Sequence, residues 1–468
     1  MSEHHDLVIL GSGSTAFAAA LRAASHGAKV LMVEKSVLGG TCINWGCVPS
    51  KTLIHTALFY QEARLGARYG LGISGDGFDY DMLSAHREEV VKYLRQTRYL
   101  DVLRDVPNLT MVRGTGRFLN PHTIEVDERE YRSDRFLVAT GGNPRVPEIP
   151  GLQEVTWLTS RSALLLKEPP RSLVVIGGGV IALEMGQMYR RLGIPVTVLE
   201  HGPRLLLNVE SEPALALQQA LSDEGMEIVT GVSVCSVARR GEETVVAAEL
   251  RGERREFAAH RLLLAVGTEP ATAGIGLERA GVELNGHGFI RVDERMATSA
   301  PGIWAAGDVV GGMMIASAGA REGIVAVDNM FGEACGCTMD YRTIPMAIFT
   351  DPEVGIVGLT EAAARAAGYD VVTNVMPAAM IPKAHVTGHR AGVIKMVADR
   401  RTGVILGVHL VSHRGAELIN EAALAVRYRM TVTDLANTLH VYPSIGEGLR
   451  LCALGFGRDL SKLSCCAE

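Results

Sequence analysis

The 468-residue sequence has no excess of positive charge, no long apolar run and few aromatic residues. Its formal net charge of −6 argues against nucleic acid as a partner, because nucleic-acid binders normally carry a basic patch or domain. The apolar run 7–10 is far too short for a signal core or a membrane span. We therefore expect a cytoplasmic protein without membrane insertion. Aromatic residues make up 5% of the chain and 52 residues are glycine, a balance that suits α/β domains with glycine-rich turns.

Cysteine is scarce as well, with eight residues, and structural disulfides are not expected because the cytoplasm keeps thiols reduced. The positions of the cysteines are more informative than their number. Close pairs stand at 42/47, 335/337 and 465/466. Cys235 and Cys452 are expected in the core, and no role is favoured for Cys335 and Cys337.

Two segments of the chain share one pattern of apolar strand, glycine-rich turn, helix and acid. The first glycine permits a tight turn, the second lets the backbone approach a pyrophosphate, and an alanine allows close helix packing. The acid follows the first glycine by 23 residues in both copies, which suits a ribose hydroxyl. One copy is a weak signal, but two with equal spacing predict two dinucleotide sites. The residues are Gly11, Gly13, Ala16 and Glu34 in the first copy, and Gly177, Gly179, Ala182 and Glu200 in the second.

A cysteine pair, Cys42 and Cys47, follows the first nucleotide unit directly. The four residues between the thiols can close a small loop, and Gly46 and Pro49 indicate a constrained turn that leads into a helix. A thiol near a helix N-terminus has a lowered pKa, which makes its thiolate available as a nucleophile or electron donor. A zinc site would need a second ligand pair, and none has suitable spacing. The pair is therefore predicted to be redox-active.

These segments, with 306–308 (Ala-Gly-Asp) and 350–355 (Thr-Asp-Pro-Glu-Val-Gly), resemble the pyridine nucleotide–disulfide oxidoreductase family over essentially the whole chain. The resemblance implies a homodimer that binds FAD on the first fingerprint and a nicotinamide cofactor on the second. Hydride passes from the nicotinamide to FAD, and the flavin then reduces the disulfide. By position, Cys47 resembles the thiol against the flavin and Cys42 the interchange thiol. The matching residues for the other flavin contacts are Lys51, paired with Glu184, and Asp308.

The resemblance also implies an α/β fold with two Rossmann-like dinucleotide-binding domains and a C-terminal α+β dimerisation domain. We expect FAD-binding parts at 1–151 and 271–342, an NAD(P)-binding domain at 152–270, and a dimerisation domain with a cysteine tail at 343–468. Further residues expected at the cofactor sites are Gly40, Thr41, Gly116, Thr140, Gly141 and Gly267.

The segment near the C-terminus departs from the disulfide-reducing members of that family. Those members supply a general acid–base as His-Pro-x-x-x-Glu, whereas here Tyr442 precedes Pro443 and Glu447 keeps the register. A phenol with a pKa of about 10 is a poor proton shuttle at neutral pH. A reaction that does not need this proton is favoured. His440, two residues upstream, is the alternative base if the register shifts.

The last residues suggest which reaction this is, because Cys465 and Cys466 are adjacent and soft thiolates bind soft metal ions. The tail and Tyr442 resemble the family members that reduce mercuric ion. By that resemblance, the tail pair of one subunit receives Hg(II) from thiol complexes and passes it to Cys42 and Cys47 of the other, where two electrons give Hg(0). The resemblance also implies a second tyrosine at the mercury site. Tyr99 matches its context, and Tyr93 is the rival.

The sequence leaves alternatives open for the choice of nicotinamide cofactor and for the substrate. Glu200 favours the free 2′-hydroxyl of NADH, whereas the resemblance implies NADPH, and His201 and Arg204 can offer positive charge. The rival functions are a disulfide reductase, either with a C-terminal dithiol relay as in large thioredoxin reductases or a dihydrolipoyl dehydrogenase, and a protein that sequesters Hg(II) without turnover.

Overall fold

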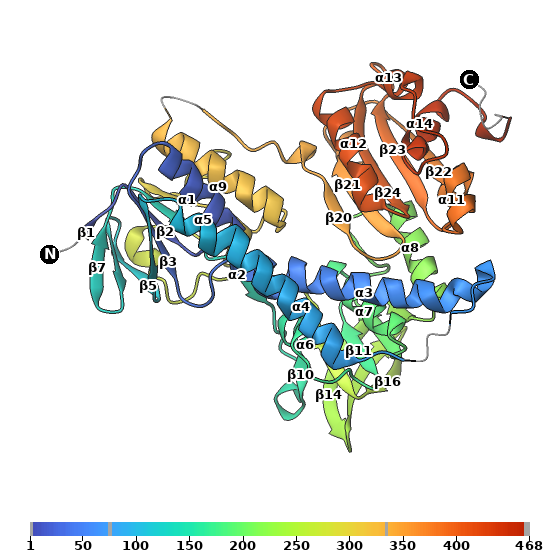
Figure 1. Ribbon diagram of the computed structural model, residues 1–468, viewed down its shortest axis with the longest axis horizontal. Coiled ribbons are helices and arrows are strands. Elements are labelled where there is room, and N and C mark those ends of the chain that lie inside the picture. The colour runs from blue at the N-terminus through green and yellow to red at the C-terminus, as the bar shows by residue number, and fades with distance from the viewer. Residues whose placement is uncertain (1–2, 74–76, 333–335, 463–468) are drawn as a thin grey trace.

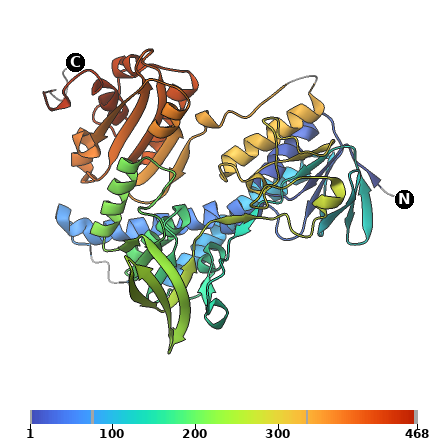
Figure 2. The same cartoon turned by 180° about the vertical axis from the view of Figure 1, so that it is seen from behind.

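The computed structural model describes residues 3–73, 77–332 and 336–462. Figure 1 shows an N-terminal lobe at the left, a C-terminal lobe at the upper right and a middle lobe below. Helix α3 (Cys47–Leu65) runs from the N-terminal lobe between the other two, and α4 (Tyr80–Arg95) runs down beside the middle lobe. Figure 2 shows the same arrangement from behind, with the two termini at opposite ends of the molecule.

The N-terminal lobe is built on a parallel sheet of order β19-β8-β2-β3-β4. Helices α1 (Ser14–Ser25) and α9 (Ala316–Phe331) lie side by side on it (Figure 1). Strand β19 comes late in the chain, so the chain returns to this sheet after building the middle lobe. The parallel strands are β2 (Leu7–Leu10), β3 (Val30–Glu34), β4 (Leu109–Arg113), β8 (Phe136–Val138) and β19 (Ile303–Ala305). A second sheet contains β1 (Glu3–His4), β5 (Gly116–Asn120), β6 (Thr123–Val126) and β7 (Arg129–Arg132).

The middle lobe repeats this plan, with a parallel sheet of order β10-β17-β11-β12-β13 and an antiparallel sheet β14-β15-β16. Two short strands, β9 (Gly142–Pro144) and β18 (Thr268–Pro270), pair where the chain enters and leaves the lobe. The parallel strands are β10 (Trp157–Leu158), β11 (Leu173–Ile176), β12 (Val196–Glu200), β13 (Glu227–Thr230) and β17 (Arg261–Leu264). The other elements are α6 (Ser160–Leu164), α7 (Val180–Arg191), α8 (Ser211–Asp223), β14 (Val232–Arg240), β15 (Glu243–Leu250) and β16 (Glu253–Ala259).

The C-terminal lobe is an antiparallel sheet of order β20-β21-β24-β23-β22 covered by α12 (Gly415–Arg427). Apolar residues of the sheet and its helices, among them Ile394, Leu410 and Ile419, form one buried core. The strands are β20 (Met346–Ile348), β21 (Glu353–Gly358), β22 (Val371–Pro377), β23 (Val393–Asp399) and β24 (Ile405–Ser412). The other helices are α10 (Glu361–Ala366), α11 (Pro382–Thr387), α13 (Val432–Asn437) and α14 (Glu447–Leu454).

The predicted fold class is confirmed, with two parallel-sheet nucleotide units followed by an α+β unit. One prediction about the core is wrong. Cys452 is buried, but Cys235 is exposed, because it lies at a bulge of β14 where the pairing register with β15 shifts between Val234 and Ser236. None of the helices in the described part of the chain has the length and apolar character that a membrane span requires.

Candidate functional site

The two glycine-rich turns have nearly the same backbone geometry. Gly11 and Gly177 have φ of 112° and 114°, and a Cβ on either would lie 2.3 Å from a carbonyl oxygen at the end of the neighbouring strand. Gly13 and Gly179 begin α1 and α7 in extended conformation, and neither helix has a side-chain cap at its N-terminus. Both helices therefore present backbone N–H groups to an anion, as a pyrophosphate site requires.

The two predicted acids end the second strand of each unit and face the middle of the turn. Glu34 accepts hydrogen bonds from the Ser12 hydroxyl and the Ser36 N–H, both at 2.6 Å. Glu200 accepts one from the Gly202 N–H at 2.5 Å, and a Cβ on Gly178 would lie 2.7 Å from its Oε2. Both carboxylates thus lie beside their glycine-rich turns, and their contact with a ribose hydroxyl stays a prediction.

The other residues expected at the first nucleotide unit fit a bound FAD. Gly40 approaches so closely that its Cβ would lie 2.6 Å from the Gly13 Cα. The Thr140 hydroxyl is buried and has no hydrogen-bond partner among the described residues, and burial raises the pKa of Asp308. A pocket of about 280 Å³ opens beside Glu34. Thr41 is exposed on α2 (Gly40–Trp45), and Gly141 and Gly267 have positive φ.

Gly116 has a packing role in the structure. Its Cβ would lie 2.3 Å from Cδ2 of Leu10, so only glycine leaves room for that leucine under the first turn. Any contribution to the cofactor site is through its backbone, and it stays a prediction.

The two thiols lie at a junction between helices, with Cys42 in α2 and Cys47 as the first residue of α3. A Cβ on Gly46 would lie 2.9 Å from the Thr41 carbonyl oxygen, so a larger residue would push the helices apart. A hydrogen bond from the Cys42 thiol lowers the pKa of Cys47 to about 7, against the partial desolvation of this surface thiol and with help from the charge of Lys51. The same bond, with burial, raises the pKa of Cys42. In the reduced pair Cys47 is therefore the thiolate and Cys42 the thiol.

Lys51 and Glu184 are 133 residues apart and form an ion pair at 2.6 Å. Glu184 is buried on α7 and also accepts a hydrogen bond from the Phe349 N–H at 2.9 Å. The Lys51 ammonium lies 4.9 Å from the centre of the Phe349 ring. Through the ion pair and its contacts with Phe349, Lys51 and Glu184 connect the three lobes one helical turn after Cys47.

The structure separates the two candidate tyrosines. Tyr99 packs on Phe17, with ring centres 4.7 Å apart, and lies beside Gly39. Burial and the nearby charges of Cys42 and Cys47 raise its pKa to about 12, which places it near the dithiol. Tyr93 is 65% exposed. The structure therefore favours Tyr99 over Tyr93.

Two arginines hold the cysteine segment, and sequence reasoning missed both. Arg95 at the end of α4 donates to the Asn44 side-chain oxygen at 3.0 Å, and Asn44 in turn donates to the Leu38 and Gly40 carbonyls. Arg161 of α6 lies 3.6 Å over the Trp45 ring. No sequence motif indicates either contact, because the residues of each pair are distant in sequence and meet only when the lobes pack together.

The segment near the C-terminus places Tyr442 at 47% exposure. His440 has a contact at each ring nitrogen: its Nε2 lies 2.7 Å from Glu421 Oε1 and its Nδ1 lies 2.9 Å from the Thr438 carbonyl oxygen. Burial raises the pKa of Glu447. Both ring nitrogens of His440 are thus occupied within its own lobe. Cys335, Cys465 and Cys466 lie outside the described residues. Cys337 packs against the core of the N-terminal lobe and is disulfide-bonded, so the expectation that the chain has no structural disulfide is wrong.

Family models match most of the chain. The model described as pyridine nucleotide-disulphide oxidoreductase matches residues 5–323, and the dimerisation domain of the same family matches 344–452. The chain belongs to the pyridine nucleotide-disulphide oxidoreductase family. Members of this family bind FAD and use a pyridine nucleotide, and the assignment of FAD to the first unit and the nicotinamide cofactor to the second stays a prediction.

Named relatives in this family carry more than one activity. A mercuric reductase from Staphylococcus aureus is 40% identical over 99% of this chain and 84% of its own length. A dihydrolipoyl dehydrogenase from Thermus scotoductus is 38% identical over 95% of this chain and 96% of its own. The Cu(II) complex of the HOCl-induced flavoprotein disulfide reductase RclA from Escherichia coli is 30% identical, with a TM-score of 0.87, and covers 98% of this chain and 100% of its own.

The match to the dimerisation domain supports a homodimer. The C-terminal lobe also exposes large apolar side chains, which is typical of a surface that another protein covers. They include Leu424, Tyr428, Leu439, Val441 and Tyr442, exposed by 55%, 71%, 80%, 78% and 47%.

Proposed function

We propose that the protein reduces Hg(II), presented as a thiol complex, to Hg(0) with electrons from NAD(P)H. The observation that carries this proposal is the segment around Tyr442. A disulfide substrate needs a proton for its leaving thiolate, yet Tyr442 stands in the place of the histidine base and His440 is held by Glu421. The relative from Staphylococcus aureus, named a mercuric reductase, supports the same reading.

With the dithiol, the atoms, protons and electrons of this reaction balance. Bound FAD would carry the two electrons of a hydride from the nicotinamide, first to reduce the Cys42/Cys47 disulfide once and then, in each turnover, to the Hg(II) held by the pair. Cys42, the interchange thiol by resemblance, attacks the mercury as it loses its proton and displaces one of the thiols that hold Hg(II), and Cys47, which is about half thiolate at pH 7, displaces the second. Overall, NAD(P)H, one proton and Hg(SR)₂ give NAD(P)⁺, Hg(0) and two RSH.

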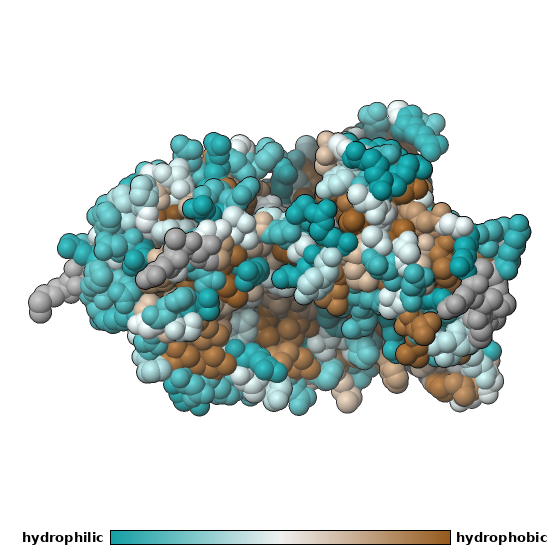
Figure 3. All heavy atoms as spheres, turned by 90° about the horizontal axis from the view of Figure 1, so that it is seen from above, coloured by the Kyte–Doolittle hydropathy of each residue, from teal (hydrophilic) through white to brown (hydrophobic). Residues whose placement is uncertain are grey.

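Delivery of the ion rests on the homodimer and the tail. Cys465 and Cys466 of one subunit would capture Hg(II) and hand it to Cys42 and Cys47 of the partner. Figure 3 shows the molecule from above, with a hollow between the N-terminal and C-terminal lobes where apolar side chains gather. An exposed Cys47 and a neighbouring Tyr99 suit exchange of a soft ion between thiolates.

The nicotinamide preference follows from Glu200 and its neighbours. Glu200 would accept a hydrogen bond from the 2′-hydroxyl of NADH. The Arg204 guanidinium donates hydrogen bonds within its own loop, so it is not free to bind a 2′-phosphate. The acceptors are the carbonyl oxygens of Leu205, Leu206, Leu207 and Val209. The resemblance implies NADPH, whereas these contacts favour use of NADH.

The second candidate is reduction of a disulfide, favoured by the relative named a dihydrolipoyl dehydrogenase. A substrate panel separates the two functions. NAD(P)H oxidation is followed with Hg(II) plus excess thiol, and then with lipoamide, oxidised glutathione and oxidised thioredoxin. We expect rapid NAD(P)H oxidation with Hg(II) plus thiol and not with any of the disulfides. Rapid oxidation with a disulfide and none with Hg(II) plus thiol would overturn the proposal.

The tail has its own test. Changing Cys465→Ala together with Cys466→Ala should spare reduction of bound FAD by NAD(P)H but slow turnover of Hg(II) bound to bulky thiols. Cys235→Ala is the matched control, because Cys235 is an exposed thiol on β14 away from the nucleotide turns. Unchanged turnover in the double variant would remove the tail from the mechanism.

A further inference from the structure

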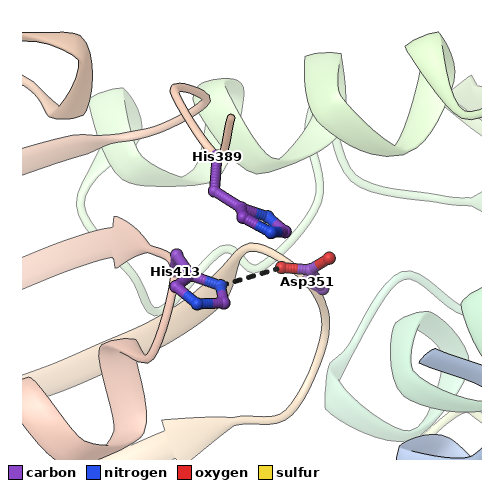
Figure 4. Close-up of side chains that lie close together, drawn as sticks. All are labelled: Asp351, His389 and His413. Carbon is purple, nitrogen blue, oxygen red and sulfur yellow. Dashed lines mark ion pairs between the residues drawn. The ribbon is translucent and has the colours of Figure 1, made fainter. Parts of the chain in front are cut away.

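Three side chains outside the flavin site bring metal-binding atoms together. Asp351, His389 and His413 each offer one ligand atom, and these atoms lie within 4.8 Å of one another. Figure 4 shows both imidazole rings directed toward the Asp351 carboxylate. From this arrangement we propose that Asp351, His389 and His413 form a site for a divalent transition-metal ion of the zinc and copper class. This site is separate from the cysteine chemistry proposed above.

The donor set selects that class of ion. Imidazole nitrogen suits zinc and copper, and a carboxylate oxygen completes a mixed nitrogen and oxygen set. Soft Hg(II) would instead prefer thiolates, so this cluster is not expected to compete with Cys42 and Cys47. Asp351 and His413 have side chains 18% and 17% exposed, so the cluster is shielded but still open to an ion from solution.

The ligand atoms are more widely spaced than in an occupied tetrahedral site. The His413 Nδ1 lies 4.0 Å from Asp351 Oδ1, beyond hydrogen-bond distance, and all three ligand atoms lie within 4.8 Å of one another. Two donors at about 2.1 Å from one ion in tetrahedral geometry lie about 3.4 Å apart. Binding would therefore draw the widest pair together by up to about 1.4 Å.

One histidine must turn for the ion to bind. The two imidazole rings are stacked, with centres 4.1 Å apart and planes 18° apart, and an imidazole lone pair lies in the plane of its ring. His389 is the ring that can turn, because it lies in the irregular segment 388–392 between two glycines of positive φ. His413 follows β24 directly and is the fixed member.

The carboxylate already has the support that ligating carboxylates need. Arg191 of α7 holds Asp351 Oδ2 at 2.8 Å, which leaves Oδ1 facing the histidines. The Gln187 amide oxygen accepts from the Asp351 N–H, and its amide nitrogen donates to the Asp351 carbonyl. Such outer hydrogen bonds orient the ligands of metal sites.

The site would tie the C-terminal lobe to the helix that carries Glu184. Glu184, Gln187 and Arg191 share one face of α7, at i, i+3 and i+7, and all three contact the segment 349–351. Binding of an ion at Asp351 would therefore stabilise the attachment of this segment to α7.

Zinc binding to the oxidised holoenzyme tests the site. The free thiols are first alkylated, and Zn(II) is then titrated by calorimetry into wild type, His389→Ala, His413→Ala and the control His287→Ala. His287 lies in a surface turn far along the chain from the cluster. We expect one zinc per chain in wild type and control, and an affinity at least about 10-fold lower in each cluster variant, the smallest loss seen for outer partners of metal sites.

A second measurement keeps the test decisive if His413→Ala loses its FAD. His389 lies in an irregular segment, so His389→Ala should keep the flavin spectrum and can be judged alone. Cu(II) bound to the wild type should show nitrogen splitting from imidazole ligands in its electron paramagnetic resonance spectrum, and His389→Ala should reduce it. Absence of zinc binding to wild type, or equal binding in wild type and His389→Ala, would overturn the proposal.

Discussion

Cys42→Ala provides a quantitative test of how the dithiol works. The hydrogen bond from Cys42 is the largest cause of the low pKa of Cys47, which stands at about 7. Without this bond, burial raises the pKa and only Lys51 and the backbone oppose it, so we expect a value of about 8.5 or above, as for a free cysteine. At pH 7 the thiolate fraction would fall from about one half to about 3%, roughly a 16-fold change.

The assay is alkylation of Cys47 in the reduced enzyme by iodoacetamide at a series of pH values, with mass spectrometry of the Cys47 peptide as the readout. The rate rises with pH as the thiolate forms, and its midpoint reports the pKa of Cys47. Cys42→Ser is the matched control, because its hydroxyl can still donate, and it should keep a midpoint below that of Cys42→Ala. An unchanged midpoint near 7 in Cys42→Ala would refute the hydrogen-bond explanation.

Three further changes test the surrounding residues. Glu184→Gln keeps the Phe349 contact but removes the charge facing Lys51. It should lower the free energy of unfolding, measured in urea, by about 1–3 kcal/mol. The control Glu3→Gln, which removes the charge of an exposed pair with Lys29, should leave the free energy of unfolding unchanged. Tyr99→Phe should lower kcat with Hg(II) by about 10-fold, and an equal loss in Tyr93→Phe would contradict the placement of Tyr99. Glu200→Ala should raise KM for NADH and leave KM for NADPH unchanged in steady-state kinetics, and an unaffected KM for NADH would remove Glu200 from the ribose site.

The nucleotide units could be predicted from the sequence because their constraints are local. Gly11 and Gly177 need positive φ and the close approach of a neighbouring strand, and each acid follows at a fixed distance along one strand–helix–strand unit. The redox activity of the pair Cys42 and Cys47 could be predicted in the same way, from a constrained turn that leads into a helix at the second thiol, whereas the separate roles of the two thiols came from the resemblance alone.

Contacts between lobes could not be predicted in this way. Lys51 and Glu184 were paired only through the family resemblance, and the Arg161–Trp45 and Arg191–Asp351 contacts have no local signal. The choice between Tyr99 and Tyr93 also depended on which face of one helical segment packs against α1. The exposure of Cys235 depended on a bulge that strand periodicity does not reveal. In each case the deciding information is the docking of elements distant in sequence.

The most direct test of the central claim measures NAD(P)H oxidation and release of volatile Hg(0) in one reaction, with Hg(II), excess thiol and the purified holoenzyme. The proposed function predicts one Hg(0) for each NAD(P)H oxidised, and no Hg(0) from Cys42→Ala or Cys47→Ala. Oxidation of NAD(P)H without matching release of Hg(0), together with rapid turnover of lipoamide, would contradict it.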